Sequence, residues 1–500
     1  MTSALAVSLL AVAGFILALW LTNIAGTAQN VVSTCMAGVT ALFDNQLSDD
    51  AKEKAARQAG LKLLAGGLNL TWRIALALAA AGLPIASADW AGVVAGEAVL
   101  GLMLRLDYIV VVSVVAFAGV KIVSWLRRAD ASEDTEGGQY SSIDQFVHNL
   151  AFSGPAVLKL GARLEDRLVR RSSTSDGQRP VFVTSLARGG TTAVLNALHD
   201  APEVATHMYR DMPFITAPVM WNKIAGGQQR GVRRQQRAHG DGMEIDLDSP
   251  EAFEEVLWKA FWPERYRGTS IPLWDVDATD PLADQFLRQH MNCIIRARNC
   301  QAGPNDVPKT RYCSKNNANI ARIPYLLRSF PDCRIVVPVR RPECHAESLL
   351  RQHNNFSKLQ ARDSFVTRYM ADIGHFEFGD LHKPFLFKDF DPVGKDTHSL
   401  DYWLDYWICA FKALLKHKDQ CILLFQDDLR SAPQANMETL YDLLGLSPAT
   451  QSFEQYFHSK PDLVRTDSFG LSRLRDAHEI YAALRDHSIT TGSAVASNRA

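Results

Sequence analysis

The residues best suited to chemistry in this chain form a short turn between an apolar strand and a helix. Residues 180–185 are short, apolar and β-branched, which predicts a buried strand, and residues 191–198 have the apolar spacing of a helix. The turn between them is Arg188-Gly189-Gly190. Glycines let the backbone N–H groups approach a bound group, and the helix dipole adds positive potential where Thr191 and Thr192 lie. The turn therefore predicts a phosphate or sulfate site, the alternative being that the threonines merely cap the helix.

This turn differs from the P-loop of proteins that bind nucleoside triphosphates. A P-loop carries a lysine directly after its second glycine, and that lysine reaches the outer phosphates. Here the cation, Arg188, precedes the glycines, and Thr191 follows them. The order of residues therefore argues against an ATP-dependent kinase, which remains the nearest enzymatic alternative.

A second basic turn follows another apolar strand later in the chain. Residues 334–339 predict a buried strand, Arg340 follows it directly, and Ser348 lies eight residues beyond Arg340 on the helix that begins near Pro342. A guanidinium offers a planar fork to a phosphate, and a serine two helical turns away can add a hydroxyl. The alternative for Arg340 is an ordinary surface arginine at the end of a strand.

Taken together, the two turns resemble the donor-binding motifs of sulfotransferases that use 3′-phosphoadenosine 5′-phosphosulfate. The resemblance implies an α/β domain with a parallel sheet and a P-loop-like turn. It implies that the first turn holds the 5′-phosphosulfate and that Arg340 and Ser348 hold the 3′-phosphate. No metal is expected. The first-turn residues in this assignment are Arg188, Gly189, Gly190, Thr191 and Thr192.

Two further segments resemble the same family. Residues 311–322 resemble the segment in which tyrosylprotein and related sulfotransferases place a lysine near the transferred sulfuryl group, here Lys315. A solvated lysine is the alternative. Residues 421–430 resemble a late strand and helix in which the family usually has a tyrosine, and Gln426 stands at that position.

The general base is the hardest residue to assign from the sequence. Related enzymes often use a glutamate shortly after the helix that follows the first turn, but Met208 and Tyr209 stand near that position. We predict Asp211 as the base and His207 as the second choice, with His239 as a further candidate. The alternatives are a surface ion pair for Asp211 and a structural histidine for His207.

Length and charge set the broad class of the protein. The chain has 500 residues, a formal net charge of −1 and 8 cysteines. This length allows two or three domains, and the near-zero charge argues against a nucleic-acid partner. The cysteine spacings match neither a zinc site nor a disulfide framework, which indicates reduced thiols in a cytosolic compartment.

The first quarter of the chain is apolar enough to enter a membrane. Residues 4–25 carry no charge and are long enough to span a bilayer of about 30 Å as a helix. Residues 63–88 and 108–126 are further candidate spans, for which a buried or interfacial helix is the alternative. Basic clusters at residues 52–62 and at Arg127 and Arg128 favour the cytoplasmic side. We expect an integral protein of a bacterial inner membrane with its catalytic domain in the cytoplasm.

The predicted organisation has four parts. Residues 1–128 form a helical membrane region, residues 129–178 a linker and helix, residues 179–487 the sulfotransferase domain, and residues 488–500 a tail.

The expected activity is transfer of a sulfuryl group to a hydroxyl of a glycan, a glycolipid or another membrane-associated acceptor. Several tryptophans could stack on sugar rings, although such residues more often lie in the core. A membrane scaffold with a non-catalytic, nucleotide-binding domain is the alternative from another class. The sequence leaves the oligomeric state open. The tryptophans considered are Trp221, Trp258, Trp262, Trp274, Trp403 and Trp407.

Overall fold

The computed structural model divides the chain into two compact units, Met1–Gly137 and Gly138–Ala500, which are described separately. The predicted linker and most of the third candidate span, residues 108–126, lie outside the described residues. The structure describes residues 2–22, 27, 34, 49–105, 108, 112, 148, 151–152, 154, 158–159, 161–165, 179–225, 235–236, 244–245, 248–303, 306–362, 364–457 and 469–489.

The first unit is built from apolar helices. Helix α1 (Thr2–Leu21) packs against α3 (Asp49–Trp90), which contains Pro84, and α4 (Gly96–Met103) packs against both. Gly14 permits a close approach, because a Cβ atom there would lie 2.9 Å from the carbonyl oxygen of Ala80. Small residues at a helix contact are typical of helices that pack by van der Waals contact alone.

The outer surface of these helices is apolar. Within the described residues, the stretch Arg57–Trp90 is long and apolar enough to cross a membrane, and Ser3–Leu19 is a shorter apolar helix. Large side chains such as Leu68 and Trp72 are exposed. Exposed large apolar side chains on helices of this length are typical of contact with lipid or with another protein.

The second unit contains a five-stranded parallel sheet in the order β2-β5-β1-β6-β7. The chain passes from β1 to the edge strand β2, returns to β5 beside β1, and then crosses to β6 on the other side of β1. The carboxyl end of β1 is thus a topological switch point, where open α/β sheets bind their ligands. The strands are β1 (Val181–Val183), β2 (Val204–Ala205), β5 (Arg311–Lys315), β6 (Arg334–Val339) and β7 (Cys421–Phe425).

Helices cover both faces of this sheet. On one face, α8 and α17 pack against alternate strand residues such as Val181, Val183 and Val336. On the other face, Phe182 and Val337 join a larger core with residues of α11, α12, α13, α15 and α18. These helices are α8 (Thr191–His199), α11 (Pro281–Asn299), α12 (Ile323–Ser329), α13 (Pro342–Gln360), α15 (Leu400–Leu415), α17 (Pro433–Leu444) and α18 (Leu471–Arg485).

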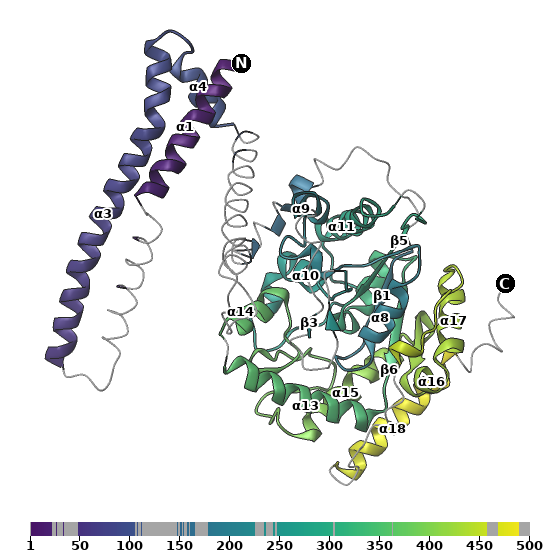
Figure 1. Ribbon diagram of the computed structural model, residues 1–500. Coiled ribbons are helices and arrows are strands. Elements are labelled where there is room, and N and C mark those ends of the chain that lie inside the picture. Colours follow the sequence, from purple (N-terminus) through teal and green to yellow (C-terminus); the bar gives the residue numbers. More distant parts are fainter. Residues whose placement is uncertain are drawn as a thin grey trace. The chain divides into compact units, whose positions relative to one another are not determined.

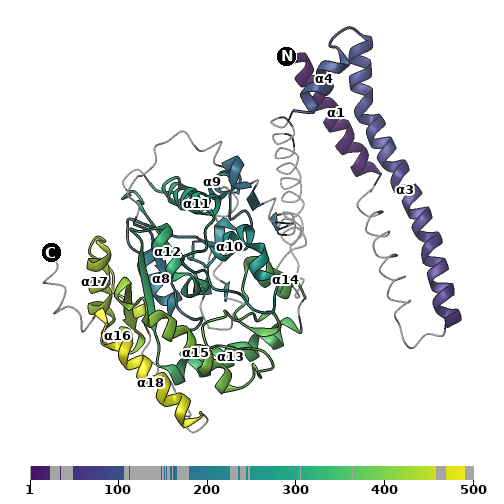
Figure 2. The ribbon, with the colours of Figure 1, turned by 180° about the vertical axis from the view of Figure 1, so that it is seen from behind.

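The remaining elements lie around this layered core. In both views α13, α15 and α18 lie together (Figures 1 and 2). A small antiparallel pair is formed by β3 (Gln235–Gln236) and β4 (Glu244–Ile245). The other helices are α9 (Pro218–Ala225), α10 (Glu255–Phe261), α14 (Ser364–Ile373) and α16 (Gln426–Ser431), with 3-10 turns η1 (Tyr209–Asp211), η2 (Pro263–Tyr266), η3 (Asn317–Ala321), η4 (Gly379–Leu381), η5 (Lys418–Gln420) and η6 (Glu454–Tyr456).

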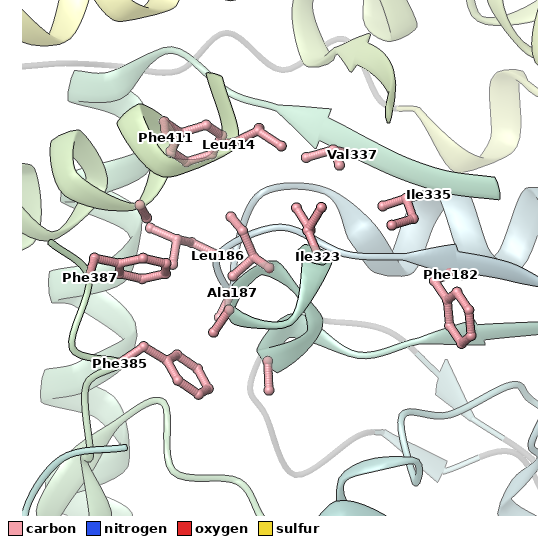
Figure 3. Close-up of a cluster of buried hydrophobic side chains, with 14 of the residues drawn as sticks. Phe182, Leu186, Ala187, Ile323, Ile335, Val337, Phe385, Phe387, Phe411 and Leu414 are labelled. Atoms are coloured by element: carbon pink, nitrogen blue, oxygen red, sulfur yellow. The ribbon is translucent and has the colours of Figure 1, made fainter. Parts of the chain in front are cut away.

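The larger core extends from the sheet to the turn after β1. Figure 3 shows Leu186 and Ala187 of that turn among the buried side chains, together with Val337 of β6 and Ile323 of α12. Trp258, Trp274, Trp403 and Trp407 are also fully buried. The expected α/β fold with a parallel sheet is confirmed, and these four tryptophans belong to the core.

The packing around α15 predicts a large stability effect for one aromatic side chain. Phe411 is fully buried and its ring stacks on Trp407 with centroids 4.3 Å apart. We expect Phe411→Ala to lower the free energy of unfolding by about 3–5 kcal/mol. The matched change Leu471→Ala, at an exposed position, should shift it by less than about 0.5 kcal/mol. Urea unfolding measures both, and equal effects of the two variants would contradict this description of the core.

Candidate functional site

The turn between β1 and α8 depends on its two glycines for different reasons. A Cβ atom on Gly189 would lie 2.5 Å from the Ser185 hydroxyl oxygen and 3.0 Å from the Leu186 carbonyl oxygen, so there is no space for a side chain. Gly190 is the N-cap of α8 with φ 100°, which is in the left-handed region that favours glycine. The twin glycines are thus required by geometry.

Arg188 also has a left-handed backbone, with φ 69°. A non-glycine residue in this region is uncommon, and such strain is concentrated at functional sites. The surrounding structure holds the turn in place, because the His345 imidazole Nε2 lies 2.8 Å from the Ala187 carbonyl oxygen. Burial and then the charge of Arg340 lower the pKa of His345 to about 3, so this ring is neutral and can donate to the carbonyl.

The two basic turns of the sequence meet at this point. The Nε atom of Arg188 donates to the Ser348 hydroxyl at 3.4 Å, and Nη1 of Arg340 donates to the Arg188 carbonyl oxygen at 3.2 Å. Ser348 is buried, Arg340 is 8% exposed and Arg188 is half-buried. The structure therefore brings Arg188, Arg340 and Ser348 into one site at the adjacent ends of β1 and β6.

The first turn of α8 completes this candidate anion site. Thr191 and Thr192 lie at the amino end of the helix, where the dipole is positive. Gln426 lies nearby, since its Nε2 would be 3.6 Å from a Cβ atom on Gly190. A ligand with separate anionic groups fits this site. The site offers it two guanidinium groups, hydroxyls and a glycine turn whose backbone N–H groups can be approached closely. These residues therefore fit a nucleotide that carries a phosphosulfate and a phosphate.

A cavity begins beside the same turn, and its empty space, which includes space open to solvent, is about 630 Å³. Leu186 and Ala187 line it from the turn, and Asn316 and Asn317 line it from the end of β5. The other lining residues are Ala252, Glu255, Ile271, Ala318, Leu349, Ile373, Gly374, His375, Phe376, Glu377, His382, Lys383, Phe385, Trp403 and Tyr406.

A chain of polar contacts joins the cavity to α8. The Thr191 hydroxyl donates to Asn317 Oδ1 at 3.0 Å, and Asn317 Nδ2 donates to Glu377 Oε1 at 3.1 Å. The other oxygen of Glu377 lies 3.3 Å from Nδ1 of His375. Burial alone would raise the pKa of Glu377, but the charge and hydrogen bond of His375, with the bond from Asn317, lower it to about 2. Glu377 is therefore a carboxylate that can orient the imidazole of His375.

Sequence reasoning missed His375 and Glu377. The two residues lie on an irregular segment between α14 and η4, so neither helical nor strand periodicity marks them. Gly374, with φ 84°, leaves no room for a Cβ atom beside the Glu255 side chain, and Gly379 has φ 72°. In the sequence, these two residues are marked only by their spacing, two positions apart between Gly374 and Gly379.

The predicted base Asp211 lies elsewhere. Its carboxylate is fully buried, forms an ion pair with Arg298 of α11, and accepts from the Met208 backbone N–H at 2.9 Å. It is absent from the residues that line the described cavity. A buried carboxylate with these partners helps to hold the fold. The role of Asp211 as general base stays a prediction, and its position does not favour it.

The second predicted base, His207, is likewise structural. It is buried, its Nε2 lies 3.1 Å from the Tyr312 hydroxyl oxygen, and its ring stacks on His290. Burial and then the charge of Arg298 lower the pKa of His207 to about 3. His207 is also absent from the lining of the described cavity. His239 lies outside the described residues.

Lys315 is the last residue of β5 and pairs in register with Val183 of β1. Its side chain is 5% exposed, which excludes the alternative of a solvated lysine. The residues directly after it, Asn316 and Asn317, line the cavity. A role for Lys315 beside the transferred group stays a prediction.

The lowered pKa of His207 predicts a pH dependence of stability. An unfolded histidine takes up a proton near pH 6.5, whereas the folded His207 does so only near pH 3. The neutral residue therefore stabilises the fold at neutral pH, and this contribution is lost as the pH falls from about 6.5 toward 3. In His207→Gln, which cannot titrate, the slope of unfolding free energy against pH should be smaller by up to about 1.4 kcal/mol per pH unit. Urea unfolding between about pH 7.5 and pH 4.5 measures this, and parallel curves for the two proteins would contradict it.

Comparisons with known proteins identify the family of this chain. A model of the sulfotransferase family matches residues 180–450, which include both basic turns and the cavity segment. A comparison with curated proteins found no match. Two similar solved structures are sulfotransferase STF9 from Mycobacterium avium (14% identity, 75% of this chain and 95% of that chain covered, TM-score 0.41) and sulfotransferase STF1 from Mycobacterium tuberculosis H37Rv (14%, 69% and 86%, TM-score 0.34). The family model matches more than half of the residues of this chain, which therefore belongs to the sulfotransferase family.

Proposed function

We propose that this sulfotransferase moves a sulfuryl group from 3′-phosphoadenosine 5′-phosphosulfate to a hydroxyl of a membrane-associated acceptor. The proposal rests on the hydrogen bonds that join Arg188 to Ser348 and to Arg340 at one end of the sheet. The turn with Arg188 would hold the phosphosulfate, and Arg340 with Ser348 would hold the 3′-phosphate. When bound, the donor supplies the activated sulfuryl group.

The chain's own residues meet the remaining demands of the reaction. Sulfuryl transfer needs stabilisation of the charge that develops on the leaving oxygen and removal of the acceptor proton. Arg188 and the amino end of α8 can supply the first. For the second, we propose His375 as the general base and Glu377 as its positioning residue. With Nδ1 protonated and facing Glu377, Nε2 holds the lone pair that accepts the proton.

The contact chain through Asn317 supports this assignment. Thr191 at the donor turn, Asn317 and Glu377 are connected by hydrogen bonds of 3.0 and 3.1 Å. The base and the donor turn are therefore held in a fixed relation by side chains from α8, the end of β5 and the segment after α14. Lys315, one residue before this chain of contacts, remains proposed as an additional contact to the sulfuryl group.

The acceptor and the location are proposed together. The apolar outer surface of α1 and α3 supports the proposal of a membrane-bound enzyme. The basic residues at 52–62 and at Arg127 and Arg128 favour a cytoplasmic position of the catalytic unit. An acceptor hydroxyl on a glycan, a glycolipid or another amphiphile at the membrane suits this location. The open cavity beside the donor turn is its proposed seat.

Donor binding can be tested by thermal unfolding of the full chain. Adenosine 3′,5′-bisphosphate should raise the melting temperature, and ATP with magnesium should not. Arg188→Ala should remove this shift, because losing a guanidinium that contacts a bound anion costs about 2–5 kcal/mol. The control Arg368→Ala removes an arginine that is 57% exposed on α14 and should retain the shift. Stabilisation by ATP with magnesium alone would indicate a kinase instead.

The base can be tested with labelled donor and an acceptor screen. His375→Gln should lower kcat by about 10²–10⁴-fold, because proton removal is lost, while the thermal shift by the bisphosphate persists. Asp211→Asn should instead lower the free energy of unfolding by about 3–5 kcal/mol, because Arg298 is left without its buried partner. An unchanged kcat in His375→Gln would refute the proposed base.

A further inference from the structure

The cavity beside the donor turn has an unusual division of polar and apolar groups. Its apolar wall is formed by deeply buried side chains from several elements. Its polar groups are Asn316, Asn317, His375 and Glu377 on the side of the donor turn, and Glu255, His382 and Lys383 elsewhere in the lining. The apolar members of the wall are Leu186, Ile271, Leu349, Ile373, Phe376, Phe385, Trp403 and Tyr406.

Several polar atoms that line the cavity are already used within the protein. Glu255 accepts two hydrogen bonds from Arg322, at 2.7 and 2.8 Å, and one from Asn316 at 2.8 Å. Lys383 Nζ donates to the Tyr266 carbonyl oxygen at 2.5 Å. The Glu255 carboxylate is therefore engaged by partners within the wall, and Lys383 is tied to the wall by one of its three N–H groups.

The polar atoms of the aromatic wall are used in the same way. The Trp403 indole N–H donates to the Thr397 carbonyl oxygen at 2.8 Å. The Tyr406 hydroxyl accepts from the Phe385 backbone N–H at 3.1 Å. The aromatic residues thus contribute mainly ring faces and edges to the cavity.

We infer that this cavity seats the apolar body of an acceptor that carries one reactive hydroxyl. The inference rests on the proposed function and narrows its acceptor class. A sugar ring would bring several hydroxyls against groups that offer few hydrogen-bond partners, and each buried, unpaired hydroxyl weakens binding. A hydrophobic alcohol gains from burial of its body and brings its hydroxyl to His375. Such a molecule also partitions into membranes. The apolar helices α1 and α3 indicate that the enzyme is located at a membrane as well.

The reaction at this acceptor balances without any further reactant. The acceptor oxygen forms a new S–O bond while the S–O bond to the 5′-phosphate breaks, and the acceptor proton passes to His375 Nε2. The products are a sulfate ester with an apolar body and adenosine 3′,5′-bisphosphate. A glycolipid remains compatible with this inference where its lipid part, and not its sugar, occupies the cavity.

The inference can be tested with two acceptors of similar size, each with a primary hydroxyl. We expect 2-naphthaleneethanol to be sulfated with a kcat/KM at least about 100-fold above that of methyl glucoside. In the presence of the bisphosphate, the naphthyl alcohol should further raise the melting temperature of the full chain, and the glucoside should not. Equal or better use of the glucoside, or no effect of the naphthyl alcohol in either measurement, would overturn the inference.

A pair of core variants localises the effect to the cavity. Phe385 lines the cavity, and Phe356 is buried in the same core without lining it. Phe385→Leu should raise the KM for the naphthyl alcohol roughly tenfold, and Phe356→Leu should leave it unchanged. The thermal shift by the bisphosphate reports that both variants are folded and bind the donor product. If both variants keep the thermal shift by the bisphosphate and have the same KM for the naphthyl alcohol, the inference alone is refuted. If the parent protein shows no thermal shift by the bisphosphate, the proposed function is refuted.

Discussion

The contact between Arg188 and the second basic turn is the constraint on which the rest of the site depends. Arg188 adopts a left-handed backbone conformation. It lies between Ala187, which is buried in the hydrophobic core, and Gly189, where there is no space for a side chain. Its carbonyl oxygen accepts from Arg340, and its side chain reaches Ser348. Strand β1 and strand β6 are neighbours in the sheet, so the sheet itself brings two distant segments of sequence into one anion site.

The core explains why this turn can hold a strained conformation. Alternate residues of the central strands pack into the two helical layers, and Leu186 and Ala187 extend one of these layers into the turn. The turn is therefore part of the hydrophobic core on one side and carries the proposed donor site on the other. Such a scaffold keeps charged groups in place without reorganisation when charge develops in the reaction, which is the main source of electrostatic catalysis.

The two basic turns that come together at Arg188 and Arg340 could be predicted from the sequence, because their signals are local. A short β-branched run, twin glycines and a helix start occur within a few residues around Arg188, and a β-branched run, an arginine and a helix start recur around Arg340. The acceptor side could not be predicted in this way. His375 and Glu377 lie on an irregular segment, and their meeting with Asn317 depends on the path of the chain between β5 and α15. The burial of Asp211 could not be predicted either, because its partner Arg298 lies on a helix far from it in the sequence.

Calorimetric binding of two nucleotides to Arg340→Ala tests the central claim most directly. If Arg340 holds the 3′-phosphate while Arg188 holds the 5′ end, the variant should bind adenosine 3′,5′-bisphosphate about 30-fold or more weakly than the parent protein does. Its affinity for adenosine 5′-monophosphate should be unchanged. Equal losses for both nucleotides, or no loss for either, would contradict the claim that the two arginines hold opposite ends of one donor.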